Sequence, residues 1–259
     1  MPNTMQLIQD LSQWRAFRNT CPNGQSIGFV PTMGVLHKGH VSLMKTSQQE
    51  NDLTVVSLFV NQTQFNNPDD FARYPRPLEA DLEVLQHEGV DVCLLPNHDA
   101  IYKDDYRFRI TENKETQRME GLVRPGHFTG VLTVVMKLLQ LVRPARVYFG
   151  EKDYQQFRII HDMVDAFFMN IEVKACPTIR EPSQLPYSSR NQRLTPEQYA
   201  LAEQFAQVFH QRASVDSILA QLSALGIRVD YVEEHEGRRF AAVHIGEIRL
   251  IDNYALRTT

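Results

Sequence analysis

The feature that most constrains the fold is a regular alternation of strand-length apolar runs with stretches of helical periodicity. The runs that we expect to form strands are residues 27–30, 53–60, 90–95, 146–149 and 171–176. Helical periodicity marks the intervening residues 41–50, 77–87, 129–142 and 153–168. Strands joined by long helical connections pair in parallel, and the helices then cover both faces of the sheet. The sequence therefore predicts an α/β fold with a parallel sheet.

Four polar segments follow these predicted strands. They are PTMGVLHKGH (31–40), NQTQFNNPDD (61–70), GEKDYQQ (150–156) and REPSQLPYSSRN (180–191). Ligands of open parallel sheets bind beyond the carboxyl ends of the strands, where such loops gather. One site built from all four loops is expected.

The pattern changes after Asn191. Thr195 and Pro196 are typical of a helix start, and we expect helices up to about residue 212 and over 215–225. Short strands are predicted over 227–232, 239–245 and 247–251, with turns at Gly237 and Gly246. We interpret residues 1–181 as the main domain and residues 182–259 as a small α+β lid domain that closes over the site.

Composition excludes several classes of protein. The 259 residues carry 27 basic and 31 acidic side chains without a long run of either sign, which argues against a nucleic-acid partner. Cys21, Cys93 and Cys176 form no close pair, which argues against a disulfide scaffold and favours a reducing cytoplasm. The N-terminus does not resemble a signal peptide, and no apolar run approaches the roughly 20 residues that a bilayer requires.

The segment GVLHKGH is suited to binding phosphate. A helix that begins near Gly39 would direct its free N–H groups and positive dipole end at an anion. His37 and His40 are three residues apart, so both could donate hydrogen bonds to one phosphate. Two capping or surface histidines would give the same pattern. Zinc is disfavoured because no third ligand lies at a convincing spacing.

Two further loops carry groups that suit a nucleotide. Gly150 lets the backbone approach a ligand, Lys152 is a point charge for phosphate, and Asp153 can accept from ribose hydroxyls. Arg190, in the stretch PYSSRN, can grip two phosphate oxygens at once. A solvated turn and a helix cap are the alternative interpretations of these two loops.

Three other polar side chains complete the candidate site. Gln64 and Gln156 can both donate and accept, which suits a substrate with hydroxyls and a carboxylate, although either could simply be exposed. Asp81 lies in a predicted helix and could contact a magnesium ion whose other ligands are phosphates, or it could belong to a solvated helix face.

Taken together, these motifs resemble the pantothenate synthetase family, which joins pantoate to β-alanine at the expense of ATP. The resemblance rests on PTMGVLHKGH, SLFVNQTQF, DDFARYPR, RPGHFTGVLTVVMKLLQLVRP, YFGEKDYQQ and SSRN, in this order. It implies a Rossmann-like nucleotidyltransferase fold with an H-x-G-H signature, a small C-terminal lid domain and a homodimer.

The resemblance also implies roles for individual residues. Pantoate would bind Gln64 and Gln156, β-alanine would arrive near Gln64, Asp81 would hold Mg²⁺, and His40 would be the general acid. ATP would be bound by three segments, consisting of Pro31, Met33, Gly34, Val35, Leu36, His37, Lys38, Gly39 and His40, of Gly150, Glu151, Lys152 and Asp153, and of Ile179, Tyr187, Ser188, Ser189 and Arg190.

Four features depart from the family pattern. Gln62 replaces a proline after the asparagine of FVN, and Ala80 replaces a residue that is often acidic. The segment before SSRN has Pro182, Ser183 and Gln184 where an Asp-Gly turn is usual. The C-terminal part is shorter than expected for the family and carries little recognisable signal outside RLIDN (249–253). These departures affect the expected shape of the second loop, the magnesium ligands, the adenine contacts and the behaviour of the lid and its hinge.

The implied reaction begins with activation of a carboxylate. Pantoate would attack the α-phosphate of ATP in line, while His37, His40, Lys152 and Arg190 stabilise the departing pyrophosphate. β-Alanine would then attack the pantoyl adenylate and release AMP. Two rival hypotheses are a nucleotidyltransferase that stops after adenylyl transfer and a non-catalytic nucleotide sensor.

Overall fold

A computed structural model describes residues 5–22 and 24–256. The described residues form two compact units that interleave along the sequence. The first unit takes its residues from Met1–Leu36, His40–Gly150 and Gln155–Cys176, and the second from His37–Gly39, Glu151–Tyr154 and Pro177–Thr259. The domain boundary at residue 181 and the lid role of the C-terminal part stay predictions.

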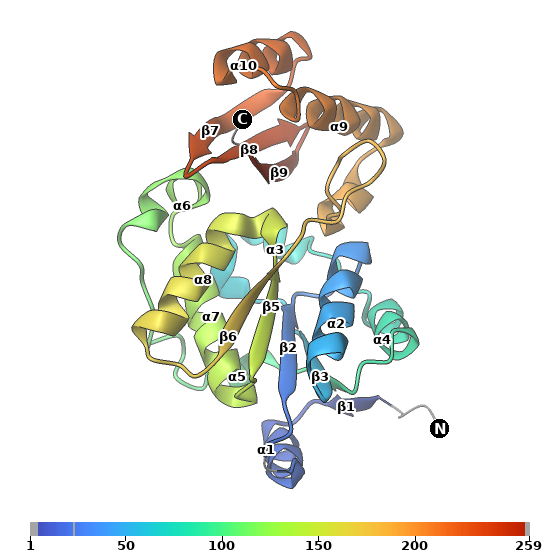
Figure 1. The fold of residues 1–259 in the computed structure, drawn as a ribbon, viewed down its shortest axis with the longest axis vertical. Helices are drawn as coiled ribbons and strands as arrows, with labels where there is room; N and C mark the ends of the chain where they lie inside the picture. The colour runs from blue at the N-terminus through green and yellow to red at the C-terminus, as the bar shows by residue number, and fades with distance from the viewer. Residues whose placement is uncertain (1–4, 23, 257–259) are drawn as a thin grey trace. The chain divides into compact units, whose positions relative to one another are not determined.

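A six-stranded parallel sheet forms the centre of the first unit (Figure 1). Its order is β1 (Gln6–Ile8), β4 (Val92–Leu94), β3 (Leu53–Leu58), β2 (Ile27–Thr32), β5 (Arg146–Gly150) and β6 (Glu172–Cys176). All neighbouring pairs are parallel. The predicted α/β fold is confirmed, and β1 is a strand that the sequence pattern did not reveal.

Alternate residues of the strands pack on opposite faces of the sheet. Phe29 and Val55 belong to one apolar cluster, whereas the next residues, Val30 and Val56, belong to another. The first cluster includes residues of α1 (Leu11–Thr20), α7 (His127–Val142) and α8 (Tyr154–Ala166), and the second includes residues of α2 (Lys38–Glu50) and α4 (Leu78–His87). Because both faces are covered there, the central strands β2 and β3 are buried along almost their whole length and are largely apolar.

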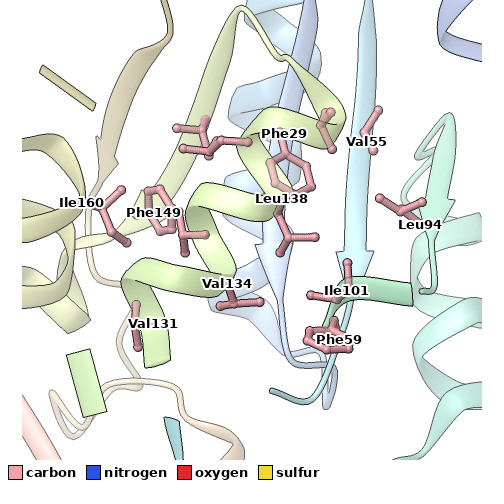
Figure 2. Packing of buried hydrophobic residues seen from close by; sticks show 14 of the residues in the cluster. Phe29, Val55, Phe59, Leu94, Ile101, Val131, Val134, Leu138, Phe149 and Ile160 are labelled. Carbon is pink, nitrogen blue, oxygen red and sulfur yellow. The ribbon is translucent and has the colours of Figure 1, made fainter. Parts of the chain in front are cut away.

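Helix α7 contributes most to the first cluster. Val131, Val134 and Leu138 recur at helical spacing, and Figure 2 shows them extending from α7 among side chains that include Phe29 and Phe149. α7 has sixteen residues, and no helix in the described part of the chain is long and apolar enough to cross a bilayer.

Helix α7 also lies unusually close to the loop after β3. A Cβ atom added to Gly130 would lie 2.4 Å from the carbonyl oxygen of Thr63. No side chain larger than glycine fits there without movement of the backbone. Gly130 therefore sets the distance between α7 and the short helix η1 (Gln62–Gln64).

The remaining short elements lie in the connections. They are α3 (Pro68–Ala72), α5 (His98–Ile101), η2 (Glu115–Gln117), α6 (Met119–Val123), η3 (Glu151–Asp153) and η4 (Ser189–Arg193). Asn67 and Asn97 cap α3 and α5 by accepting backbone N–H groups.

The second unit has a three-stranded antiparallel sheet, β7 (Arg228–His235), β8 (Arg238–Ile245) and β9 (Ile248–Ala255). Gly237 and Gly246 form its turns with φ of 72° and 58°, as the sequence predicts. Helices α9 (Pro196–Phe209) and α10 (Val215–Ala224) share an apolar cluster with the sheet. Thr195 caps α9 with a complete capping box. The predicted small α+β part is confirmed.

Candidate active site

The site predicted from the sequence follows the central strands of the sheet. Strands β2 and β5 are neighbours in the sheet. The strands that follow β2 in the sequence, β3 and β4, lie on one side of this pair, and β6, which follows β5, lies on the other side. This arrangement makes the β2–β5 border the topological switch point of the sheet, where ligands of doubly wound folds bind. The loops beginning at Met33 and at Glu151 follow these two strands directly.

The first loop is held by a buried carboxylate. Gly34 and Val35 both have positive φ, 79° and 54°, a conformation that a β-branched residue such as Val35 rarely adopts. Asp81 on α4 is 5% exposed and accepts the N–H groups of Val35 (2.9 Å) and Leu36 (2.7 Å), one at each carboxylate oxygen. Thr32 Oγ1 accepts the N–H of Gly34 at 3.1 Å. These bonds fix the loop in its unusual conformation.

Gln64, predicted to bind substrate, is held from two sides. Its backbone carbonyl accepts from His127 Nδ1 at 2.8 Å and from Arg124 Nη2 at 3.4 Å. Its side-chain oxygen accepts from Asn61 Nδ2 at 3.0 Å. The motif RPGHF leaves it open whether His127 caps a helix or lines the pocket, and the sequence pattern gives no role to Asn61 or Arg124. The available signal for Asn61 is its position directly after the predicted strand 53–60, three residues before Gln64.

Gln64 and His127 line a cleft of the first unit that also includes Arg107 and Arg109. Two guanidinium groups on the wall give the cleft positive charge, and the amide of Gln64 adds a neutral polar group. Such a surface suits a small carboxylate. The exposed arginines were not among the predicted site residues because they follow no strand or recognised motif.

The two glutamines of GEKDYQQ have different environments. Gln155 is buried, and its amide bonds backbone groups of Glu115 (2.7 Å), Arg118 (3.0 Å) and Glu120 (3.0 Å). It therefore ties α8 to the segment before α7. Gln156, the residue predicted to hold pantoate, is half-buried on α8.

In the second unit, His37 is a neutral imidazole. Burial and then the positive charge of Lys152 lower the pKa of His37 to about 4. Nδ1 accepts the N–H of Gly39 at 3.1 Å, so the ring proton lies on Nε2. His37 can thus offer a neutral N–H donor beside a lysine. His40 is half-buried on α2 of the first unit.

The loop Glu151–Tyr154 is fixed by residues distant in the sequence. Asn253 Nδ2 donates to the carbonyls of Glu151 (2.9 Å) and Lys152 (2.8 Å). Arg238 donates to Asn253 Oδ1 at 2.6 Å and lies 3.9 Å from the centroid of the Tyr154 ring. Sequence reasoning assigned no role to either residue, although Asn253 lies in the recognisable stretch RLIDN.

Several predicted ATP-binding residues of the second unit lie together. Lys152, Ser188 and Arg190 line one small pocket, and Ser188 Oγ accepts the Arg190 N–H at 3.3 Å. The Lys38 ammonium group lies 5.4 Å from the centroid of the Tyr187 ring. The carbonyl of Ile179 accepts the N–H of Tyr187, which joins the ends of the altered hinge segment.

The altered hinge forms a tight turn without glycine. Gln184 adopts a φ of 72°, the left-handed conformation that a glycine would adopt more easily. Arg180 donates to the carbonyl of Gln184 at 2.8 Å and grips both oxygens of Asp252, each at 2.8 Å. His210 also contacts Asp252, at 2.9 Å. An ion-pair cluster thus holds the turn.

No cluster of three or more potential metal ligands occurs among His, Cys, Asp and Glu in residues 5–22 and 24–256. The observed donors are instead a neutral imidazole, a lysine, an arginine and hydroxyls, which suit phosphate oxygens. The fold and these loops define a Rossmann-like α/β protein with nucleotide-binding features.

Comparison with known proteins identifies the family to which this chain belongs. The family model for pantoate-β-alanine ligase matches residues 3–255. The pantothenate synthetase of Legionella pneumophila (strain Corby) is 59% identical over 252 residues, covering 97% of this chain and 100% of the relative. That of Coxiella burnetii (strain Dugway 5J108-111) is 52% identical, covering 95% of both chains. The chain belongs to the pantoate-β-alanine ligase family.

Solved structures agree with this assignment. The pantoate-β-alanine ligase of Francisella tularensis, solved in complex with β-γ ATP and β-alanine, is 42% identical with a TM-score of 0.95 and covers 98% of this chain and 99% of its own. Pantothenate synthetase of Thermus thermophilus is 37% identical with a TM-score of 0.90, covering 98% of this chain and 100% of its own. The predicted family and enzyme class are therefore confirmed: the chain is an ATP-dependent enzyme that joins pantoate to β-alanine.

Proposed function

We propose that this chain joins pantoate to β-alanine through a pantoyl adenylate. An amine does not convert a free carboxylate into an amide directly, because it would have to displace oxide, a very poor leaving group, from the carbonyl carbon. A pantoate oxygen therefore bonds to the α-phosphorus of ATP while the bond to the β-phosphate oxygen breaks, releasing pyrophosphate. The amine of β-alanine then bonds to the carbonyl carbon, the bond to AMP breaks, and the nitrogen loses its proton.

The observation that carries this proposal is a set of side chains in the second unit that can donate hydrogen bonds to phosphate oxygens. Lys152 shares a pocket with Ser188 and Arg190, and its charge also acts on the neutral imidazole of His37. We assign the stabilisation of pyrophosphate to Lys152, Arg190, His37 and His40, with His40 as general acid. Preorganised donors of this kind stabilise charge that develops in the transition state.

The other substrate contacts are part of the same proposal. The loop Pro31–His40, the loop Gly150–Asp153, Ile179 and the segment Tyr187–Arg190 bind ATP, and Gln64 with Gln156 binds pantoate. The positively charged cleft beside Gln64 supports this assignment because both organic substrates carry a carboxylate. No covalent enzyme intermediate is required.

Magnesium is expected to accompany ATP, but Asp81 does not fit the role of its ligand in this conformation. Each of its oxygens already accepts a backbone N–H, and Ala80 offers no second carboxylate. A magnesium ion held mainly by phosphates and water fits better. The proposed reaction therefore has no step that depends on a protein-held ion, and Asp81 as a metal ligand stays a prediction.

The assembly and location of the enzyme also remain proposals. The family resemblance supports a homodimer, which sedimentation at several concentrations would test. Among the described residues, Cys21, Cys93 and Cys176 form no disulfide, which supports the proposed reducing cytoplasm.

Product analysis tests the adenylate. With pantoate, ATP and magnesium we expect pyrophosphate, and AMP should appear when β-alanine is added. ADP formation would overturn the adenylate mechanism. Pyrophosphate release without amide formation would favour an adenylyl transferase, and ATP binding without any pyrophosphate would favour a nucleotide sensor. Replacement of His40 or Lys152 by alanine should lower kcat roughly 10²- to 10³-fold.

A further inference from the structure

A buried polar network connects Gln64 to side chains that the proposed reaction does not use. Asn61, 1% exposed in the loop after β3, lies at its centre. Asn61 Nδ2 donates to the carbonyl of Gly130 at 3.2 Å and to Gln64 Oε1 at 3.0 Å. Asn61 Oδ1 accepts from Tyr102 Oη at 2.7 Å and Thr63 Oγ1 at 3.0 Å. All four polar contacts of the amide are therefore made within the first unit.

This network has only one consistent polarity. A backbone carbonyl can only accept, so the amide nitrogen of Asn61 must face Gly130. The same nitrogen has a second hydrogen, which points to Gln64 and requires an oxygen there. Gln64 must consequently direct Oε1 at Asn61, and its own NH₂ group is left to donate elsewhere. The position of one main-chain oxygen thus decides whether Gln64 presents a donor or an acceptor.

The hydroxyl of Tyr102 holds the other end of the Asn61 amide. It donates to Asn61 Oδ1, and its oxygen lies 3.1 Å from Thr63 Oγ1. If the Asn61 amide turned over, its oxygen would face the Gly130 oxygen, whereas the two hydroxyls could then accept from its NH₂ group. The Gly130 carbonyl therefore sets the orientation of the amide, and Tyr102 holds the amide in place by donating to Oδ1.

We propose that Tyr102 is a positioning residue for the acid site: through Asn61 it holds the Gln64 amide so that its NH₂ group donates to an oxygen of the acid substrate. This inference rests on the proposed role of Gln64 in binding pantoate. It adds the direction of the hydrogen bond: Gln64 donates, so the site recognises a substrate oxygen that accepts. It also names a residue that need not touch any substrate.

The environment of Tyr102 suits a permanent donor. The side chain is 4% exposed, and burial raises its pKa to about 12, so the hydroxyl keeps its proton at physiological pH. The ring packs against Phe59 and Tyr106, at centroid distances of 6.4 Å and 5.5 Å, and Lys137 Nζ lies 4.9 Å from its centroid. Tyr102→Phe would keep these ring contacts and remove only the hydroxyl.

Tyr148→Phe is a matched control. Tyr148 is also buried, and its hydroxyl accepts from Asn51 at 2.7 Å and donates to Glu50 at 2.9 Å, without contacting the Asn61 network. Both variants lose one hydrogen-bonded hydroxyl and should be destabilised comparably. In steady-state assays we expect Tyr102→Phe to raise the KM for pantoate about 3- to 10-fold, the range for one hydrogen bond, while the KM for ATP is unchanged. Tyr148→Phe should change neither KM.

A double-mutant cycle with Gln64→Ala separates positioning from general structural damage. We expect Gln64→Ala to raise the KM for pantoate and Tyr102→Phe to have no further effect in that background. If Gln64→Ala raises this KM but Tyr102→Phe behaves like Tyr148→Phe, or if the two effects simply add, the positioning role is overturned and the proposed function stands. If Gln64→Ala leaves the KM for pantoate unchanged, the proposed role of Gln64 fails, and the positioning role fails with it.

Discussion

Two buried polar residues, Asp81 and Asn61, hold the loops that follow two neighbouring strands, but they do so in different ways. Asp81 accepts two backbone N–H groups of the loop after β2. Asn61 both donates and accepts in the loop after β3, where it contacts the side chain of Gln64. A carboxylate can fix only groups that donate, so Asp81 fixes the course of the backbone. An amide has both kinds of group, so Asn61 can also fix the polarity of another amide.

This difference predicts which substrate each residue affects. The loop held by Asp81 contains the residues proposed to bind ATP, whereas the network of Asn61 ends at the residue proposed to bind pantoate. Replacement of either residue by its isosteric counterpart, Asp by Asn or Asn by Asp, changes donors into acceptors with little change in volume. These substitutions therefore test directly whether the two residues act on different substrates.

The largest effect on the free energy of unfolding is expected from Asn61→Asp. The new carboxylate would face the Gly130 carbonyl, which can only accept, and would place a negative charge in a buried position beside it. We expect a loss of about 3–5 kcal/mol in the free energy of unfolding, measured with urea. Asn97→Asp is the control, because the exposed Asn97 uses only its oxygen, as an acceptor from Ala100 N, and should be nearly neutral. Equal losses in both variants would contradict the polarity argument.

A smaller effect is expected from Asp81→Asn. One oxygen can still accept, but the new NH₂ group faces the other backbone N–H, leaving it without a partner. The cost should be roughly 1–3 kcal/mol in urea unfolding, and the KM for ATP should rise. Asp52→Asn is the control, because Asp52 accepts from Ser26 N and Oγ at an exposed position. An unchanged KM for ATP would show that Asp81 has no bearing on the ATP loop.

The smallest effect on the free energy of unfolding at neutral pH is expected from His37→Gln. The lowered pKa of His37, about 4 instead of 6.5, means that the folded chain leaves this ring neutral while the unfolded chain protonates it between these values. Protonation therefore favours unfolding, and stability is lost as the pH falls below about 6.5 towards 4.

The pH dependence of unfolding measures this effect. Comparing urea unfolding at about pH 7.5 and about pH 5, we expect the wild-type protein to lose more stability than His37→Gln. Because His37 stays neutral in the folded protein over this range, the pH profile of kcat/KM should have the same shape in the wild type and in His37→Gln. Identical losses of stability would mean that His37 titrates normally in the folded protein.

The main features of the fold could be predicted from the sequence because its core strands are apolar on both faces. Strands such as Leu53–Leu58 stand out as continuous runs, and their order along the chain implies parallel pairing. β1 could not be recognised in this way, since it has three residues of which only Ile8 is buried. The turns at Gly237 and Gly246 were predictable because the residue type itself indicates the backbone conformation.

The site was predictable only in part. Motif positions identified the loops that follow β2, β3 and β5, because a loop's place at a strand end depends on local sequence. The groups that hold these loops depend on tertiary packing instead. Asp81 reaches Val35 across 46 residues, and Asn253 reaches Glu151 across 102. Neither contact leaves a periodic or local signal, so Asp81 suggested a metal ligand and Asn253 suggested nothing.

The separate substrate roles of the two loops can be tested by measuring the KM for ATP and the KM for pantoate in both Asp81→Asn and Tyr102→Phe, in one assay of pantothenate formation. We expect a crossed result, in which Asp81→Asn raises only the KM for ATP and Tyr102→Phe raises only the KM for pantoate. If both variants raise both constants equally, or if the effects are exchanged, the two loops do not have the separate substrate roles assigned to them.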